Sequence, residues 1–568
     1  MKSSTQYTSA TFFLIVAASF LYQSLFFMFD YFPADEGLMV QVSQRMLQGE
    51  TLYRDIFLPY TPLAWCVEAG IFRVFGYSYT AARIFPSFLF SLMCGIVFLW
   101  AREMMSFRYA VGCAVAAVLY RMWVWAYWQY FSYSVLAIFF AMAAGYFFVV
   151  YLKHGRRCFF MLLAGALAGL CFWSKPNVGV QTLAAMGLSL IACNVIGTPI
   201  EIRRMLRQSA MLLAGFVAVS VPFALILLTD KTFDDMLVHM GTLRAAYFHS
   251  DRHIPFPRPW PIFGTDPMVR ENLFYLMPGV LYQFFAHVQE TFLLNLYATP
   301  FIETAIKGIY YFPMLILVVG GAMAADSLRN LSRKANVPVF IFTFLFALLV
   351  FLQVFFFPVV NYLFIVLPPS IILLFASVGK IMESDRLMRM KPAQAGLKTL
   401  CVLGAVVYVC VSLWMTAVYV RAERQAIRTS RGTVQVHEAR GRIFQTVYEY
   451  LMAETAPGDT VFVVPHNPLI YFFTDRRNPT RYDNLQPDTP GKQAQQEIIG
   501  SLERDKTRTV IFDQEEFPKK TRLPNAYPLL YNYIVENYVP VLDIPGQLTI
   551  YERKGVEEVG PSVSGPGK

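Results

Sequence analysis

Two adjacent carboxylates, Asp35 and Glu36, follow the first long apolar segment of the chain, and Asp55 comes later in the motif YRDIF. Carboxylates beside a membrane segment are costly, and they commonly face a cavity that serves a function. A carboxylate placed there can take a proton as a general base. The alternative is a plain helix start, because acids in the first turn of a helix over 35–48 favour its dipole.

The composition predicts a polytopic membrane protein. Of the 568 residues, 56% are hydrophobic and only 15% are charged, whereas soluble domains have roughly 25% charged residues. Several apolar runs reach the roughly 20 residues that cross a bilayer. The net charge of +10 is explained by cytoplasmic loops rich in Lys and Arg, so no nucleic-acid partner is expected.

Eleven apolar stretches are predicted as membrane-spanning helices. The first, 11–29, is too long for the core of a signal peptide and has no small-residue cleavage site after it. The others lie at 83–101, 109–127, 133–152, 158–174, 177–197, 209–229, 305–325, 337–357, 359–379 and 397–420.

The positions of Lys and Arg predict which side of the membrane each loop faces. With the N-terminus in the cytoplasm, cations gather in the inside loops around 102–108, 153–157, 203–207, 329–334 and 380–391, as the positive-inside rule requires. An odd number of spans then leaves the C-terminus outside. Reporter fusions at residues 385 and 430 should report opposite sides of the membrane, and the same side for both would refute this topology.

Three segments are then expected outside the membrane, namely the loops 30–82 and 230–304 and the tail from residue 421. Within the second loop, the apolar stretch 279–298 carries His287 and Glu290 near its middle. These polar residues favour an interfacial or re-entrant helix over a twelfth span.

The tail predicts a small α/β domain. Helical spacing alternates with short β-rich runs, the helices over 441–454 and 492–506 and the strands over 459–465, 508–513 and 546–553. The alternation indicates a small parallel or mixed sheet. We therefore expect a transmembrane domain over 1–420, a soluble α/β domain over 421–560 and a disordered tail over 561–568.

The ordered set of motifs resembles the C-type (GT-C) fold of membrane glycosyltransferases, in the bacterial branch related to protein O-mannosyltransferases and to the lipid A aminoarabinose transferase. In that pattern an acidic pair follows the first span, and then come an amphipathic helix, G..LYRD, an aromatic–Pro–Leu turn and G.S...AR. All occur here, in DEGLMVQVSQRMLQGETLYRDIFLPYTPL and FGYSYTAAR. AGALAGLCFWSKPNVG (164–179) is similar to the family's small-residue fifth span ending in Lys. The likeness covers residues 10–230 and is only topological over 230–420.

The resemblance implies a transferase that takes a hexose or pentose from a polyprenyl phosphate. The sugar would pass, with inversion, to a hydroxyl of a glycan, lipid or protein acceptor at the outer face of a bacterial inner membrane. The C-terminal domain would then be periplasmic. By motif position, Asp35 is the general base, Glu36 supports or orients it, and Asp30 is the second candidate.

A departing lipid phosphate needs cations close by in a low-dielectric site. The candidates for binding the donor phosphate or the substrate are Lys175, Arg83, Arg121, Tyr60, Arg54, Asp55, His249, Arg252, His253 and Arg258. Several also have a structural interpretation. Lys175 fits a snorkelling interfacial lysine, Arg83 fits an anchor of the second span, and Arg54 with Asp55 fits an ion pair.

A metal cofactor is not expected. His249 and His253 are four residues apart, but the prolines at 255, 257, 259 and 261 argue against a helix that continues there. No Cys or third His lies close by, and the eight cysteines form no CxxC pair, so a divalent metal is not favoured. A mobile loop that covers the donor is the preferred interpretation of this segment.

Two other functions use similar features. A transporter or flippase of lipid-linked sugars would favour charges in mid-span and broken helices from inverted repeats, and the sequence shows no such symmetry. A ligase or polymerase of lipid-linked saccharides would differ from a sugar transferase only in the identity of its donor and its product.

Overall fold

The computed structural model describes most of the chain. The described residues are 2–125, 127–155, 158–196, 202–249, 254–262, 266–282, 300–329, 336–356, 358–383, 391–485, 491–513, 523–545 and 547–555. Three sequence predictions lie wholly or largely outside them. These are the placement of Arg252 and His253, most of the stretch 279–298, and the tail 561–568.

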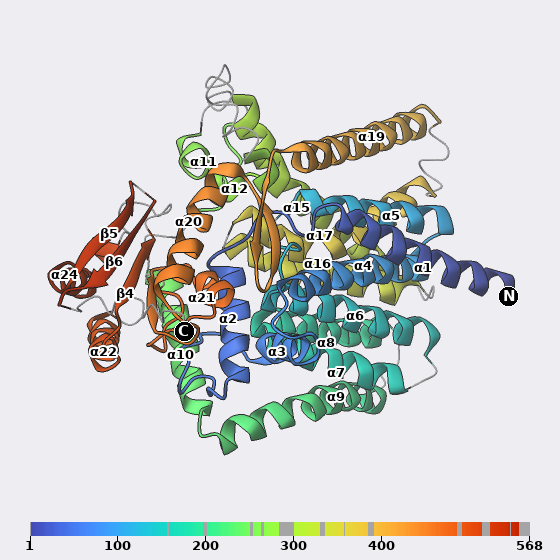
Figure 1. The fold of residues 1–568 in the computed structure, drawn as a ribbon. Coiled ribbons are helices and arrows are strands. Elements are labelled where there is room, and N and C mark those ends of the chain that lie inside the picture. The colour runs from blue at the N-terminus through green and yellow to red at the C-terminus, as the bar shows by residue number, and fades with distance from the viewer. Residues whose placement is uncertain are drawn as a thin grey trace. The chain divides into compact units, whose positions relative to one another are not determined.

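Each of the eleven predicted spans overlaps a helix (Figure 1). These helices are α1 (Lys2–Ser24), α4 (Tyr79–Met104), α5 (Phe107–Leu119), α6 (Tyr133–His154), α7 (Cys158–Ser174), α8 (Pro176–Ile196), α9 (Ile202–Thr229), α15 (Pro300–Arg329), α16 (Asn336–Phe356), α17 (Leu363–Met382) and α19 (Lys391–Arg421). In the described part of the chain, eight helices are long and apolar enough to cross a membrane. The chain is therefore a polytopic α-helical membrane protein, and the count of eleven spans is approximate.

The chain divides into two compact units. The first contains residues 1–29, 60–233 and 251–423, and the second contains 30–59, 234–250 and 424–568. The sequence-based division at residue 420 placed the segments 30–59 and 234–250 with the membrane helices. The second unit thus holds the acid pair of the first loop.

Close helix packing in the first unit depends on small residues. A Cβ atom added to Gly165 of α7 would lie 2.0 Å from the carbonyl oxygen of Leu212, and one added to Gly215 of α9 would lie 2.0 Å from that of Leu162. Such small-residue contacts let membrane helices approach closely without a hydrophobic driving force. The helices α4, α6, α16 and α17 also pack against one another (Figure 1).

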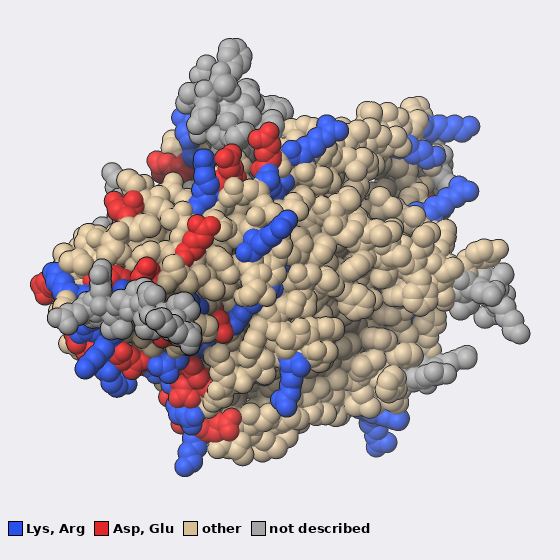
Figure 2. All heavy atoms as spheres, in the orientation of Figure 1, with Lys and Arg blue, Asp and Glu red and all other residues tan. Residues whose placement is uncertain are grey.

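Apolar side chains cover the outer surface of the helices. They are exposed along α9, as at Leu213 and Val217, and along α19, as at Val402 and Val406. Figure 2 shows long stretches of the helical unit without charged side chains. Lipid tails would solvate such a surface, whereas water would not.

Two predicted spans end earlier than expected. Helix α1 ends at Ser24 instead of Phe29, and α5 ends at Leu119 before the 3₁₀ turn η1 (Tyr120–Met122). The buried Arg121 of η1 donates to the side chains of Gln23 and Gln129. Hydropathy does not register these polar contacts. The regular helix ends just before the turn that contains this arginine.

The second unit contains a mixed sheet, as predicted. Its strand order is β3–β4–β6–β5, with β3 (Val461–Val464) and β4 (Thr509–Asp513) parallel and β6 (Leu548–Arg553) antiparallel to both β4 and β5 (Tyr538–Ile544). The predicted helices are α20 (Glu438–Glu454) and α22 (Gly491–Arg504). Strand β5 was not predicted, because Pro540 interrupts its pattern. The structure places it at an edge, where proline is tolerated.

The remaining elements are short. In the second unit they are α2 (Asp35–Leu47), α10 (Phe233–His249), the hairpin of β1 (Gln425–Thr429) and β2 (Gly432–Val436), α21 (Leu469–Thr474), α23 (Leu523–Ala526) and α24 (Pro528–Asn537). In the first unit they are α3 (Leu63–Phe75), α11 (Pro267–Glu271), α12 (Leu273–Leu276) and η2 (Val360–Tyr362). The core of the second unit joins Phe57 of the first loop to Val464, Leu502 and Val510 of the tail. The first loop therefore folds as part of this unit.

Candidate active site

The acid pair opens helix α2, and its two members have different environments. Asp35 is exposed in the first turn, whereas the side chain of Glu36 is buried. Oε2 of Glu36 accepts a hydrogen bond of 3.1 Å from the main-chain N–H of Phe32. Glu36 thus ties the entry of the helix to the preceding turn, and Asp35 presents its carboxylate at the surface of the second unit.

Helix α2 is held from its first turn to its last. A Cβ atom on Gly37 would lie 2.5 Å from the main-chain nitrogen of Leu469, so only glycine permits this approach to α21. At the other end, the guanidinium of buried Arg45 lies 2.7 Å from the carboxylate of Asp483 and 2.6 Å from that of Glu50. The tail therefore fixes the helix that carries Asp35.

Asp30, the second candidate base, has partners for both its main chain and its side chain. Its main-chain N–H donates to the carbonyl of Gln435 at 2.7 Å, and its buried carboxylate lies 3.8 Å from the guanidinium of Arg424. This environment favours a structural ion pair over a base that must accept a proton.

Arg54 and Asp55 form the ion pair that the sequence suggested. Their side chains lie 3.1 Å apart and both are substantially exposed. The hydrogen bond from Arg54 lowers the pKa of Asp55, and the main-chain N–H of Thr51 also donates to its carboxylate. The pair stabilises the turn that contains it. These contacts do not support a direct role of either residue in chemistry.

Lys175 lies in the first unit at the junction of α7 and α8, inside a cluster of aromatic rings. Its Nζ is 4.6 Å from the ring centre of Tyr362 and 5.5 Å from that of Tyr133, and it donates to Oγ of Ser134 at 3.0 Å. The ring of Tyr60 stacks on Tyr133 at 4.4 Å. The structure thus brings together two of the predicted site residues, Lys175 and Tyr60.

The charge of Lys175 has no carboxylate partner among the described residues, although only 7% of the residue is exposed. An ammonium group has three donors, and one of them is used by Ser134. A buried, unpaired cation is costly, and an anion that enters the site would compensate it.

Arg83 and Arg121 lie at the end of α1. Arg83 donates to the carbonyls of Phe27 at 3.1 Å and Phe29 at 3.3 Å, and it packs on the ring of Tyr79. Gln129 donates to the carbonyls of Phe26 and Phe29 and accepts from Arg121. These side chains donate to carbonyls in the turn that follows α1, at residues 26, 27 and 29.

The remaining predicted residues belong to the second loop. His249 is the last residue of α10, and Arg258 is exposed in the proline-rich segment 254–262. That segment contains no helix or strand and packs on α15, where Tyr311 donates to the carbonyl of Pro257 and Lys307 to that of Pro261. Among the described residues, no cluster of three or more His, Cys, Asp or Glu side chains could hold a metal.

Sequence reasoning missed His239 of α10. Its Nδ1 accepts from the main-chain N–H of Leu58 at 3.4 Å, and its ring lies 4.4 Å from that of Phe57. Burial, together with the charge of Arg481, lowers the pKa of His239 to about 4, so the ring is neutral at physiological pH. No motif marks this residue, because its contacts form only when the loops fold together.

Searches of protein-family models and of curated proteins find no match to this sequence. Solved structures do match. ArnT from Cupriavidus metallidurans bound to undecaprenyl phosphate has a TM-score of 0.55 and 14% identity, covering 98% of this chain and 99% of that one. Its apo state has a TM-score of 0.56 and 13% identity, covering 97% and 98%.

A third match is the oligosaccharyltransferase of Archaeoglobus fulgidus in its apo form. The TM-score is 0.52 and the identity is 11%, covering 96% of this chain and 75% of that one. All three matches extend over nearly the whole of the present chain, so the likeness includes both units. The chain therefore has the C-type fold of membrane glycosyltransferases.

Proposed function

We propose that the chain is a glycosyltransferase that moves a sugar from a polyprenyl phosphate to an acceptor hydroxyl at the outer face of a bacterial inner membrane. The observation that carries this proposal is the end-to-end likeness to ArnT, a protein whose structure holds undecaprenyl phosphate. The acidic pair at the start of α2 supplies the second support, because the sequence around it resembles the motifs of this group of transferases.

The proposed reaction follows from the residue types. The carboxylate of Asp35 takes the proton of the acceptor hydroxyl while the oxygen bonds to the anomeric carbon. The bond from that carbon to the phosphate oxygen breaks at the same time, and the lipid phosphate departs with the electron pair. Attack from the face opposite the leaving group inverts the anomeric centre. Cations near the phosphate stabilise the departing charge.

Lys175 is our choice for the phosphate site, because it is buried, lacks a carboxylate partner and has unused donors. Substituting it as Lys175→Met should weaken binding of undecaprenyl phosphate by roughly 10- to 100-fold, the value of a charge-assisted hydrogen bond. Binding can be measured on the purified protein by native mass spectrometry. The matched control is Lys391→Met, at an exposed lysine, which should leave binding unchanged. Equal binding by wild type and Lys175→Met would remove the assignment.

Arg83, by contrast, is proposed to be structural. The variant Arg83→Met should lower thermal stability in detergent, because the carbonyl of Phe27 loses this donor, and a polar group left unsatisfied costs ~1–3 kcal/mol. Binding of undecaprenyl phosphate should remain within about twofold of wild type at temperatures where the variant is folded. A large loss of binding at normal stability would instead place Arg83 at the phosphate.

Two experiments on the purified protein test the proposed function as a whole. The protein should bind undecaprenyl phosphate, and it should release that lipid phosphate from a polyprenyl-phosphate sugar only when an acceptor is present. Movement of intact lipid-linked sugar across a vesicle membrane, with no cleavage of the sugar–phosphate bond, would instead identify a flippase.

A further inference from the structure

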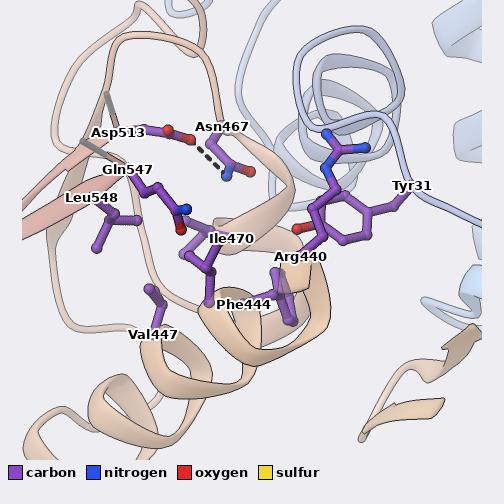
Figure 3. Close-up of a pocket in the computed structure, with 10 residues that line it drawn as sticks. Tyr31, Arg440, Phe444, Val447, Asn467, Ile470, Asp513, Gln547 and Leu548 are labelled. Atoms are coloured by element: carbon purple, nitrogen blue, oxygen red, sulfur yellow. Dashed lines mark hydrogen bonds between the residues drawn. The ribbon is translucent and has the colours of Figure 1, made fainter. Parts of the chain in front are cut away.

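The cavity beside strands β3 and β4 is lined by groups that already contact one another (Figure 3). Its volume of about 20 Å³ has room for about one water molecule. Nδ2 of Asn467 donates to the carboxylate of Asp513 at 3.0 Å, and the guanidinium of Arg440 lies over the ring of Tyr31. An exposed apolar surface lies instead on the proline-rich segment 254–262 of the first unit.

The segment 254–262 carries an exposed tryptophan. Trp260 is 71% exposed, and Ile262 is exposed as well. Arg258 and the prolines at 255, 259 and 261 also face outward. Tryptophan is highly buried on average in proteins, so this segment presents a side chain that water solvates poorly.

The main chain of the segment is held against α15 at three points. Tyr311 donates to the carbonyl of Pro257 at 2.7 Å, Lys307 to that of Pro261 at 3.0 Å and Thr304 to that of Ile262 at 2.7 Å. Lys307 is buried and also pairs with the carboxylate of Asp266 at 2.8 Å. The exposure of Trp260 therefore belongs to a backbone that is fixed in place.

The three contact residues lie on the face of α15 that turns toward lipid. Residues three and four apart share a helix face, so Thr304, Lys307 and Tyr311 form one row. Leu315 and Val318 continue this row, and both are exposed. Because α15 is long and apolar enough to cross a membrane, lipid covers this row, and the segment 257–262 lies on its end.

The charged residues of α15 indicate the depth of the segment. The uncharged run from Lys307 to Asp326 is ~29 Å long at a helical rise of roughly 1.5 Å per residue, close to the ~30 Å of a hydrocarbon core. The contact residues around Lys307 therefore lie where hydrocarbon meets headgroups. The positions of Lys and Arg predict that this is the outer boundary.

Helix α12 adds further aromatic side chains at the same level of α15. Its Leu273 and Leu276 are buried, whereas Phe274 and Tyr275 are exposed. The hydroxyl of Tyr310 donates to the carbonyl of Leu276 at 3.4 Å, next to the turn that holds the segment 257–262. Aromatic residues gather in this way at membrane–water interfaces.

We propose that the segment 257–262 is an interfacial anchor that inserts Trp260 and Ile262 into the lipid leaflet at the Lys307 end of α15. Arg258 then faces the phosphates of the phospholipid headgroups. An anchor of this kind differs from the mobile cover of the donor that the sequence favoured. The inference does not depend on the proposed transfer reaction.

The test measures the fluorescence of Trp260 in the full-length protein, in phospholipid nanodiscs that contain no undecaprenyl phosphate. The chain has eight tryptophans, so the emission of Trp260 is the difference between wild type and Trp260→Phe, which keeps an aromatic ring. Equal thermal stability of the two proteins shows that the difference comes from Trp260 alone. Phospholipids brominated near the headgroup end of their acyl chains should quench this emission severalfold more than aqueous acrylamide does.

A tryptophan in water serves as the matched control. Gln496→Trp, at an exposed position of α22, is made in the Trp260→Phe background and should show the opposite order of quenching. Quenching of Trp260 mainly by acrylamide would place its ring in water and overturn the proposal. Weak quenching by both agents would mean that protein covers the ring, as a donor cover would require, and would overturn the proposal as well.

Discussion

The variant Asp35→Asn is expected to transfer sugar roughly 10²- to 10⁴-fold more slowly than wild type, the usual contribution of a general base. Asparagine keeps the size of the side chain but cannot accept the acceptor's proton. Binding of undecaprenyl phosphate should be unchanged, because Lys175 is proposed to hold the phosphate. Turnover and lipid binding are both measured on the same purified preparation.

Two neighbouring substitutions serve as controls. Glu36→Gln keeps an oxygen that can accept from the N–H of Phe32, so its turnover should fall much less than that of Asp35→Asn. Asp30→Asn should chiefly destabilise the protein, because it removes the charge facing Arg424. Near-normal turnover in Asp35→Asn, with a large loss in Asp30→Asn, would transfer the role of base to Asp30.

The variant Arg45→Met is expected to destabilise the second unit by about 3–5 kcal/mol, because it leaves the carboxylate of Asp483 buried without its cation. Asp483 is fully buried, with 0% of its side chain exposed. Hydrogen exchange should show α2 opening a hundredfold or more often, since every 1.4 kcal/mol is a factor of ten.

The matched control for Arg45→Met is Arg54→Met, which breaks an exposed pair that contributes only ~0–1 kcal/mol. The double variant Arg45→Met with Asp483→Leu should recover much of the protection of α2 from hydrogen exchange. An apolar pair of similar volume often replaces a buried ion pair at little cost in stability. If α2 is equally protected from hydrogen exchange in the Arg45→Met and Arg54→Met variants, the buried network does not hold the helix.

The sequence predicted the membrane helices well, because the bilayer requires long apolar runs and hydropathy records them directly. It failed where polar side chains act inside the bundle. The turn after α1 is held by Arg83 and Gln129, which come from distant parts of the chain and donate to the carbonyls of residues 27 and 29. Residues 30–59 looked like a membrane loop, yet they fold with the tail through Arg45 and Asp483.

The acid pair could be predicted because it is local, with Asp35 and Glu36 adjacent at the start of a helix. The surroundings of Lys175 could not, because Ser134, Tyr133 and Tyr362 come from other helices. The contact between Asn467 and Asp513 was missed for the same reason. Asn467 and Asp513 meet only when β3 and β4 pair.

The most direct test of the central claim is the amount of polyprenyl-phosphate-linked sugar in cells of the source organism, measured by mass spectrometry of the lipid extract. The account predicts that one such species accumulates when the gene is deleted, and again when only Asp35→Asn is expressed, and that wild-type chain removes it. Unchanged levels of every polyprenyl-phosphate sugar in both strains would contradict the account.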